Sequence, residues 1–129
     1  MALVIDLKPK EKVIVGKAVI TNDNQRTRLH ISGDAPILRE KDVLREDEAT
    51  TPCRMIYYII QGMYLADDPT MLYEDYFTQI RSIQDAAPST SLHFAEINQF
   101  ILAGQYYKAL REAKKLIAYE EELIGHVAE

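Results

Sequence analysis

TPCRMIYYIIQGMYL, residues 51–65, is the stretch at which the chain changes from strand patterns to helix patterns. Thr51 is a residue type that caps helices, and Pro52 follows at the first helical position, where proline is tolerated. Apolar side chains then cover nearly every side of the helix that this stretch predicts. Such a helix is typically buried against several neighbours or at a subunit interface.

The residues before this stretch show the alternation of β-strands. Leu3–Leu7 and Thr27–Ser32 place apolar side chains on one face at every second position, and Ile37–Arg39 is a shorter candidate. Lys12–Thr21 is rich in β-branched residues and is interrupted by Gly16, which indicates a turn or a bulge. Short strands at this spacing predict a small antiparallel sheet or barrel.

The residues after the stretch show helical spacing. Three further helices are expected over Thr70–Ala87, Leu92–Ala103 and Tyr106–Leu123, separated by segments that contain Pro or Gly. The predicted fold class is therefore α+β. A β-rich module over residues 1–48 precedes a bundle of about four helices over residues 49–129.

The composition of the 129 residues is that of a soluble globular protein, with 47% hydrophobic and 27% charged residues. One cysteine, Cys53, excludes an intramolecular disulfide and fits a reducing compartment. The apolar start of the chain is interrupted early by Asp6, so we expect no signal peptide, and no apolar run is long enough to span a bilayer. These features predict a cytoplasmic protein that does not contact a membrane.

The net charge of −5 is divided unevenly along the chain. Residues 1–45 hold nine Lys and Arg and six Asp and Glu, whereas residues 46–129 hold six and fourteen. An acidic whole argues against nonspecific binding to polyanions, and the basic first part is the candidate for an anionic partner. Chance scatter of charge between short segments is the alternative explanation.

Residue patterns that carry bond chemistry are missing. No glycine-rich phosphate-binding motif occurs, and His30, His93 and His126 have no partners at metal-ligand spacing. Cys53 lies in a first helical turn, but no neighbouring residue supplies a base, so we expect it to pack as a small apolar residue. The sequence predicts no catalytic residue, no metal and no cofactor.

A row of basic residues follows one of the predicted strands. Arg26, Arg28 and His30 are spaced two apart, so they project from the face opposite the apolar Leu29. Two guanidiniums and an imidazole are suited to gripping phosphates or stacking on bases. Arg39 is a further exposed candidate for binding RNA. The alternative for each of them is the solvated face of a half-buried strand.

Two other sets of residues lie on the predicted helices. Lys108, Arg111 and Lys115 form one stripe, for which a solvated face beside acidic residues is the favoured interpretation. Tyrosines within helical patterns are expected to be core or interface anchors rather than platforms for base stacking. The residues expected at a partner or oligomer surface are Met55, Tyr58, Ile59, Tyr106 and Tyr107.

Five blocks carry a resemblance to a known family: LVIDLKPKEKVIVGKAVITN (3–22), RTRLHISGDAPILREKDVL (26–44), TPCRMIYYIIQGMYL (51–65), AAPST (86–90) and ILAGQYYKALREAKKLIAYE (101–120). Through them the chain resembles the FlbT family of flagellin-synthesis regulators nearly from end to end. The resemblance implies a post-transcriptional repressor that associates with the 5′ untranslated region of flagellin mRNA and promotes its decay. Flagellin production would thereby be coupled to assembly of the flagellum.

KEKVIVGKAVIT (10–21) and GDAPILREKDV (33–43) also resemble two stretches of the CsrA-type RNA-binding proteins. That resemblance implies an intertwined dimeric barrel whose edge binds RNA through the residue that matches Arg39. The segment between Ala-Pro and Arg-Glu is shorter here, and no basic residue precedes Lys8 on the first strand. An RNA groove is therefore expected from Arg26, Arg28, His30 and Arg39.

These observations predict a cytoplasmic, non-enzymatic homodimer or other homo-oligomer that binds a flagellin mRNA leader through its β-rich module. A flagellar regulatory or assembly protein is a further expected partner. The alternative is a protein-binding adaptor of flagellin or of an assembly factor, for which any effect on mRNA is indirect. The net charge favours this alternative, because dedicated nucleic-acid binders are usually basic.

Overall fold

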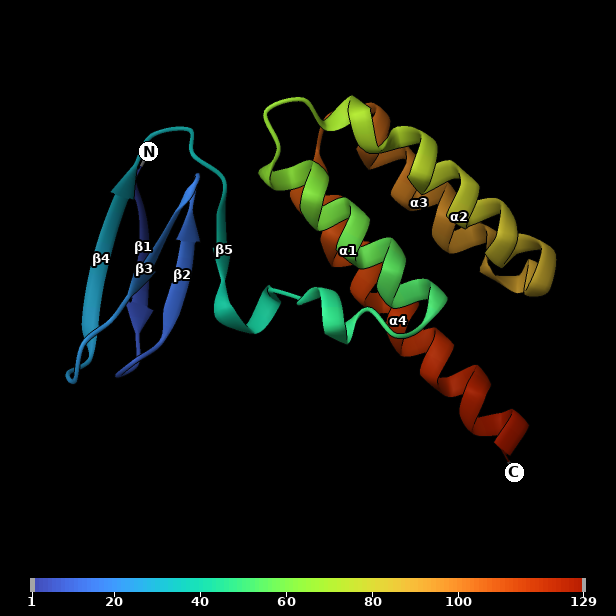
Figure 1. Cartoon of the computed structure of the whole chain (residues 1–129), viewed down its shortest axis with the longest axis horizontal. Coiled ribbons are helices and arrows are strands. Elements are labelled where there is room, and N and C mark those ends of the chain that lie inside the picture. Colours follow the sequence, from blue (N-terminus) through green and yellow to red (C-terminus); the bar gives the residue numbers. More distant parts are fainter. Residues whose placement is uncertain (1, 129) are drawn as a thin grey trace. The chain divides into compact units, whose positions relative to one another are not determined.

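A computed structural model describes residues 2–128. The chain divides into two compact units, Met1–Val43 and Leu44–Glu129, here termed the strand unit and the helical unit. Within the described residues, the strands lie in the first unit and the α-helices in the second, so the predicted α+β fold is confirmed (Figure 1). None of the helices in this part of the chain is long and apolar enough to cross a membrane.

The strand unit holds two small antiparallel sheets. Its strands are β1 (Ala2–Leu7), β2 (Lys12–Val15), β3 (Ala18–Thr21), β4 (Thr27–Ser32) and β5 (Ile37–Arg39). One sheet pairs β1 with β4, and the other has the order β3-β2-β5. The predicted Lys12–Thr21 segment is two strands, because Gly16 adopts a left-handed conformation (φ +62°) at the turn between them.

The inner faces of the strands supply the core of this unit. Ile5, Leu7 and Val13 are buried, and half-buried Leu29 and Ile31 pack against them. β4 begins at Thr27, so the predicted alternation holds for Arg28 onward while Arg26 precedes the strand. Among residues 2–128, no strand pairs with the outer edge of β3, and all four β3 residues are exposed.

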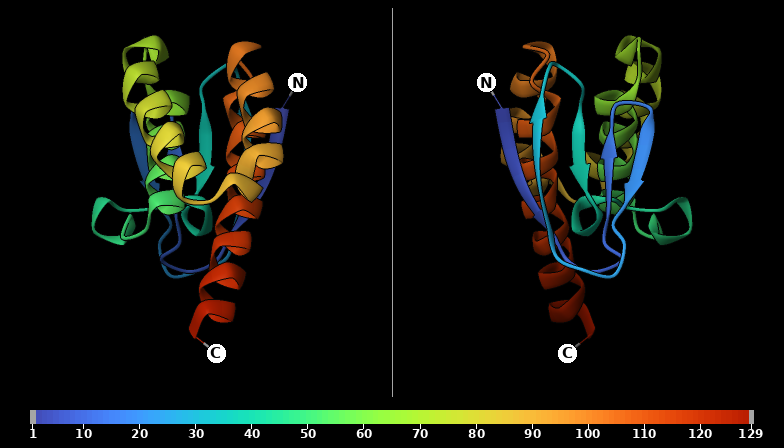
Figure 2. Two further views of the ribbon diagram at one scale, coloured as in Figure 1. Left: turned by 90° about the vertical axis from the view of Figure 1, so that its right-hand side faces the viewer. Right: turned by 90° about the vertical axis from the view of Figure 1, so that its left-hand side faces the viewer.

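The helical unit contains four α-helices joined by short segments. They are α1 (Pro52–Leu65), α2 (Tyr73–Ala86), α3 (Ser91–Leu102) and α4 (Tyr106–Ala128). Short 3₁₀ turns of this unit lie at Glu46–Glu48, Pro69–Leu72 and Pro88–Thr90, and a further one, Glu40–Asp42, lies in the strand unit. α1 packs against α2 and α4, and α4 packs against α3 (Figure 2). The buried residues of the helices are mainly aliphatic and aromatic: Ile56, Ile60, Met63, Tyr76, Phe94, Ile97, Ile101, Leu110 and Leu116.

The start of α1 is held by the predicted Thr51 cap and by a carboxylate of α4 that the sequence does not indicate. The Thr51 side chain accepts a hydrogen bond from the Arg54 amide (3.2 Å), so the predicted cap is confirmed. Glu120 of α4 also accepts hydrogen bonds from the Thr51 hydroxyl and the Cys53 amide. A carboxylate at this position stabilises the positive end of the helix dipole.

Candidate nucleic-acid interface

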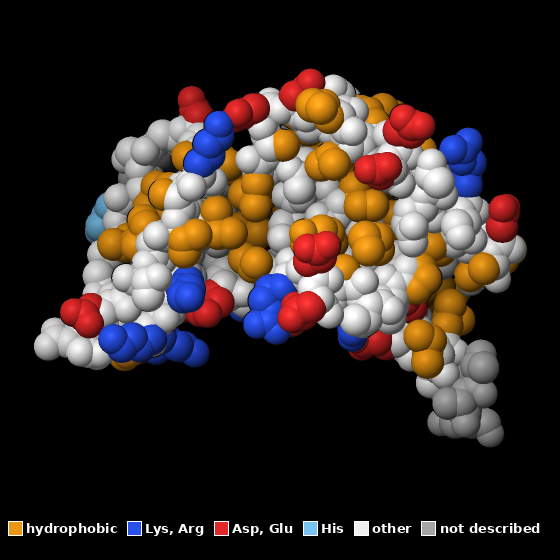
Figure 3. All heavy atoms as spheres, in the orientation of Figure 1, with side chains coloured by type: hydrophobic (Ala, Val, Ile, Leu, Met, Phe, Trp, Pro, Cys, Tyr) orange, Lys and Arg blue, Asp and Glu red, His pale blue; other side chains and the backbone are white. Residues whose placement is uncertain are grey.

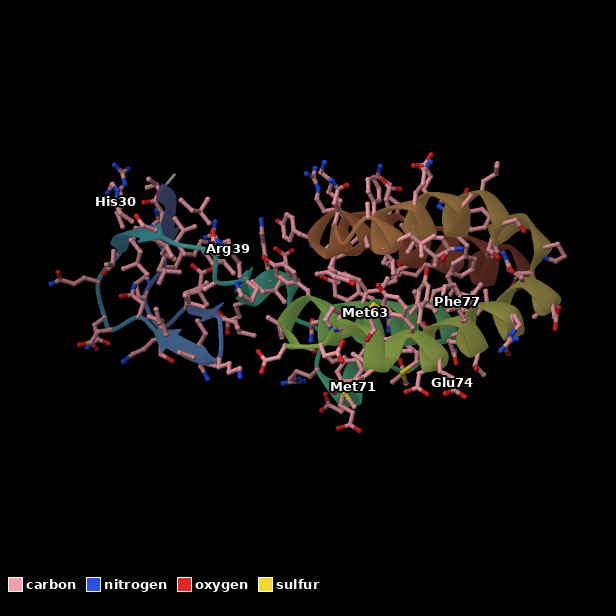
Figure 4. The ribbon with its side chains drawn as sticks, turned by 90° about the horizontal axis from the view of Figure 1, so that it is seen from above. His30, Arg39, Met63, Met71, Glu74 and Phe77 are labelled. Atoms are coloured by element: carbon pink, nitrogen blue, oxygen red, sulfur yellow. The ribbon has the colours of Figure 1, made fainter. Side chains whose placement is uncertain are left out.

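The outer face of the β1–β4 sheet carries two of the expected RNA-binding residues. Arg28 lies opposite Asp6 and His30 lies opposite Val4, and all four side chains are exposed. Leu29 and its apolar neighbours point to the core instead, because successive side chains alternate along β4. His30 projects away from its own unit in Figure 4. An elongated anion can therefore reach both the Arg28 and the His30 side chains from one side of the sheet.

Arg28 is paired with Asp6 on this face. The Arg28 Nε lies 3.1 Å from Asp6 Oδ1, and about two thirds of both side chains is exposed (66% and 64%). An exposed ion pair of this kind is worth less than about 1 kcal/mol, so a phosphate could displace the carboxylate at little cost. A shallow depression of about 350 Å³ is lined by Asp6, Arg26, Thr27 and Arg28. The structure thus brings Arg26 and Arg28 together even though Arg26 lies outside β4.

Arg39 is not the exposed residue that the sequence predicts. It lies opposite Val13 in the β2–β5 ladder, on the face that carries the core, and its side chain is only 35% exposed. Its Nη2 donates a hydrogen bond to the Asp6 carbonyl oxygen (2.7 Å) and lies 3.6 Å from Glu11 Oε2. Its Nε is buried without a hydrogen-bond partner among the described residues. Arg39 therefore ties one sheet to the other.

The Arg39 contact depends on an ionised Glu11. The Lys8 amide donates a hydrogen bond to Glu11 Oε1 (2.9 Å). This hydrogen bond, reinforced by the positive charges of Arg39 and Lys8, lowers the pKa of the Glu11 carboxyl below its usual 4.5. Glu11 consequently stays negative under mildly acidic conditions and keeps its attraction for Arg39.

Asn22 organises the end of the strand unit where β1 finishes. Its buried side-chain amide donates hydrogen bonds to the carbonyl oxygens of Leu7 (3.2 Å), Lys8 (2.9 Å) and Gln25 (2.8 Å). These contacts fix the loop after β1 against the segment that leads to Arg26. The Asn-Asp-Asn sequence indicates only a turn, because a side chain that bridges distant carbonyls leaves no local pattern.

Three lysines at this end of the unit were missed in the sequence analysis. A second depression, of about 340 Å³, is lined by Lys8, Lys10 and Lys41 together with Pro9, Glu11 and Glu40. Lys10 adopts a left-handed backbone (φ 66°), which is uncommon for a residue with a side chain, and its Nζ lies 3.6 Å from Asp23 Oδ1. Leu7, which precedes Lys8 in the chain, pairs with Thr27, which lines the depression beside Arg26.

The basic stripe on α4 is present but partly neutralised. Lys108, Arg111 and Lys115 are all exposed. Lys115 Nζ donates a hydrogen bond to Glu112 Oε1 (3.0 Å) one turn away. The stripe therefore has the character of a solvated helix face.

The residues expected at a partner surface fall into two groups. Met55, Tyr58 and Ile59 line a groove between α1 and α2. Tyr106 instead shares a hydrogen bond with Tyr73 between their hydroxyl oxygens (2.7 Å), and Tyr107 packs on the Tyr64 ring at 5.7 Å between ring centroids. Burial, followed by the Tyr73 hydrogen bond, raises the pKa of Tyr106 to about 12. Tyr106 therefore contributes to the interior of the helical unit.

Cys53 has the environment of a structural residue. Burial, with a smaller contribution from the Glu120 carboxylate, raises the pKa of the thiol to about 12. A thiol that stays protonated at neutral pH is a poor nucleophile. Among residues 2–128, no group of three or more His, Cys, Asp or Glu side chains is placed to hold a metal ion.

Comparison with known proteins defines the class to which this two-unit chain belongs. The family model described as "Flagellar protein FlbT" matches residues 3–124. "Probable flagellum biosynthesis repressor protein FlbT 1" of Bradyrhizobium diazoefficiens is 48% identical over 126 residues, which cover 97% of this chain and 86% of the relative. The "Flagellum biosynthesis repressor protein FlbT" of Caulobacter vibrioides is 37% identical over 131 residues, covering 99% and 93%.

A third relative, from Rhodopseudomonas palustris, also has the name "Probable flagellum biosynthesis repressor protein FlbT" and is 44% identical over 125 residues, 97% of this chain and 99% of the relative. No solved structure matches the chain. The family model and these relatives match nearly the whole chain. The chain therefore belongs to the FlbT family of flagellar proteins.

Proposed function

We propose that this protein is a cytoplasmic post-transcriptional repressor of flagellin synthesis that binds the 5′ untranslated region of flagellin mRNA. Binding would make the leader unavailable to ribosomes or available to nucleases, and flagellin production would follow flagellum assembly. Family membership and the names of the relatives support the repressor role. The observation that carries the RNA target is the convergence of Arg26, Arg28 and His30 on one accessible side of the strand unit.

The charge of the two units supports the same assignment. The strand unit has a net charge of +2 and the helical unit one of −7. Single-stranded RNA is held mainly through its phosphates, so it favours the strand unit and is repelled by the other. In this mechanism Arg26 and Arg28 bind phosphates, and His30 contacts a base or a further phosphate. Additional phosphates along the RNA are bound by the lysines of the second depression, Lys8, Lys10 and Lys41.

Arg39 has a positioning role in this proposal. It holds the Asp6 backbone, and the Asp6 side chain in turn orients Arg28. About a third of its side chain is exposed, which leaves room for one further contact. Replacing Arg39 is therefore expected to disturb the shape of the interface as well as remove a charge.

The RNA site is tested by fluorescence anisotropy with a labelled flagellin 5′ leader RNA at near-physiological salt. The Arg26→Glu/Arg28→Glu variant should lose saturable binding while its circular dichroism stays that of the wild type. The matched control is Lys108→Glu/Arg111→Glu on α4, which makes the same change of charge on the other unit and should bind almost normally. For wild type, the logarithm of affinity should fall with the logarithm of salt by about 0.7 per phosphate contact.

Two results would overturn the proposal. One is a wild-type protein that shows no salt-sensitive, saturable binding to the leader. The other is an equal loss of binding in the strand variant and the α4 control, because the effect would then reflect overall charge rather than a site. Arg39→Glu is measured separately, with unfolding by urea as a check on the fold.

We also propose that the strand unit self-associates into a homodimer or other homo-oligomer. The unpaired β3 strand exposes Val19 (61%) and Ile20 (39%), and a sheet edge with apolar residues is suited to pairing with another chain. Val19→Lys should shift the protein to monomer in sedimentation equilibrium. A wild type that is already monomeric at the concentrations used for RNA binding would refute this part.

The alternative function is that of a protein-binding adaptor of flagellin or an assembly factor. The specific observation that favours it is the apolar groove between α1 and α2 on the acidic helical unit. An adaptor would not bind the isolated leader RNA in a salt-sensitive, saturable manner. The anisotropy experiment therefore separates the two functions.

A further inference from the structure

A groove runs along α1 on the side that faces α2. Its volume is about 740 Å³, and its apolar lining comes from Met55, Tyr58, Ile59 and Leu65 of α1 and from Leu72 before α2. Together with Gly62, which also lines the groove, these α1 residues lie on one face at helical spacing and form a stripe about 15 Å long. All of them are half-buried rather than buried, so part of each side chain remains in contact with solvent.

The charged residues around the groove are mainly acidic. Residues 55–80, which supply its lining, contain four Asp and Glu and no Lys or Arg, and the neighbouring cation Arg81 donates a hydrogen bond from its Nη2 to Thr78 Oγ1 in the wall (3.5 Å). Asp75 lines the groove directly, and Glu74 and Met71 project from the same side of the helices in Figure 4. Figure 3 shows hydrophobic side chains over α1 and α2, with carboxylates and a basic side chain around them. An apolar stripe with a negative border favours a ligand that is apolar on one side and positive on its flanks.

We propose that this groove binds a cationic amphipathic helix of a partner protein. The apolar face of that helix would fill the stripe between Met55 and Leu65, at the i, i+3, i+4 and i+7 spacing that a helix in a groove requires. Its Lys and Arg residues would lie over Asp75 and the neighbouring carboxylates. This inference concerns the helical unit and does not depend on RNA binding by the strand unit.

Two other occupants fit the groove less well. RNA phosphates would be repelled by Asp75 and the neighbouring carboxylates, which outnumber the one cation that contacts the wall, Arg81. A second copy using the same face in a symmetric dimer would place like charges opposite each other, because an isologous interface pairs a patch with itself. A basic helix would meet these carboxylates with opposite charge instead of like charge. The charge pattern therefore favours a basic helix over RNA or a second copy.

The proposal is tested with two labelled peptides of about 15 residues, long enough to span the stripe. One is built from Leu and Lys in an amphipathic helical pattern, and the other has Glu at every Lys position. The Leu–Lys peptide should bind the full chain saturably with one site, and the Leu–Glu peptide should not. Fluorescence anisotropy gives both affinities.

Matched variants locate the binding. Asp75→Lys should weaken the Leu–Lys peptide roughly fivefold, and Asp85→Lys, on the same helix but outside the groove lining, should weaken it far less. Ile59→Ala should weaken binding by about tenfold, because it removes an apolar contact at the centre of the stripe. Urea unfolding shows whether each variant keeps its fold.

Three outcomes would overturn the inference. Equal effects of Asp75→Lys and Asp85→Lys, or no effect of Ile59→Ala, would mean that the peptide binds the acidic surface without using the groove. A wild-type oligomer that Ile59→Ala dissociates in sedimentation equilibrium would identify a second copy as the occupant. Loss of leader RNA binding in folded Ile59→Ala would assign the groove to RNA.

Discussion

The strand unit and the helical unit differ in how much core supports them. Among the described residues, four apolar side chains are buried in the strand unit and fifteen in the helical unit, although the second unit has only twice the length. The strand unit compensates with polar ties, namely Asn22 to three carbonyls and Arg39 to the Asp6 backbone. Small units with thin cores commonly depend on such additions or on self-association. The comparison indicates that packing holds the helical unit and that directed hydrogen bonds hold the strand unit.

The largest expected effect is in the helical core. Phe94 is fully buried, so Phe94→Ala should lower the free energy of unfolding by about 3–5 kcal/mol through lost burial and a cavity. Chemical denaturation followed by circular dichroism at the helical band measures this loss. The exposed Leu92→Ala on the same helix is the control and should change little. Equal losses in both variants would contradict a packed helical core.

The second effect tests the polar ties of the strand unit. Asn22→Ala should cost about 1–3 kcal/mol, because it leaves carbonyl oxygens near the end of β1 without their donor. Hydrogen exchange should accelerate first at the backbone amides of Lys10 and of position 22, which bond to the Asp23 and Glu11 carbonyl oxygens within this corner. Asn24→Ala, at an exposed neighbouring position, serves as the matched control. Unchanged exchange would show that the corner is held in another way.

A smaller effect is expected at the first turn of α1. Thr51→Ala removes the cap of the Arg54 amide and a contact with Glu120, so it should cost about 1 kcal/mol. Thr51→Ser keeps the hydroxyl and should recover most of the loss in the same denaturation experiment. Failure of the serine variant to recover stability would indicate that the methyl group, rather than the hydroxyl, matters.

The smallest expected effect is a pH dependence at Glu11. Its pKa is lower in the folded chain than the ordinary 4.5, so its ionised form stabilises the fold above that value. The stabilisation is lost as the pH falls through the folded-state pKa. Wild type should therefore exceed Glu11→Gln in stability at neutral pH, and the two should converge in acid. A difference that widens on acidification would show that the carboxylate does not supply it.

Much of the fold was predictable because it depends on local patterns. The alternation of β4, the cap at Thr51 and the order of strands before helices each follow from neighbouring residues. Two boundaries differed for equally local reasons: Lys12–Thr21 divides at Gly16, and the segment before Tyr73 is a 3₁₀ turn. Arg28 and His30 could be assigned to one face from their spacing alone.

The remaining features of the candidate interface required the tertiary structure. Arg39 is half-buried because the antiparallel register places it opposite Val13, and register depends on which strands pair. The neighbouring lysines at positions 8, 10 and 41 come together only when the loop after β1 folds against the segment after β5. Their spacing along the chain contains no sign of that proximity.

The sequence by itself determined the fold class, the division of charge and the family, because each depends on residue types and their order. Only the tertiary structure decided which polar groups became structural ties and which apolar residues of α1 remained half-exposed in a groove. The physical reason is that burial and hydrogen bonding depend on contacts between residues distant in the chain. A periodic pattern specifies the face on which a side chain lies, but it does not specify what covers that face.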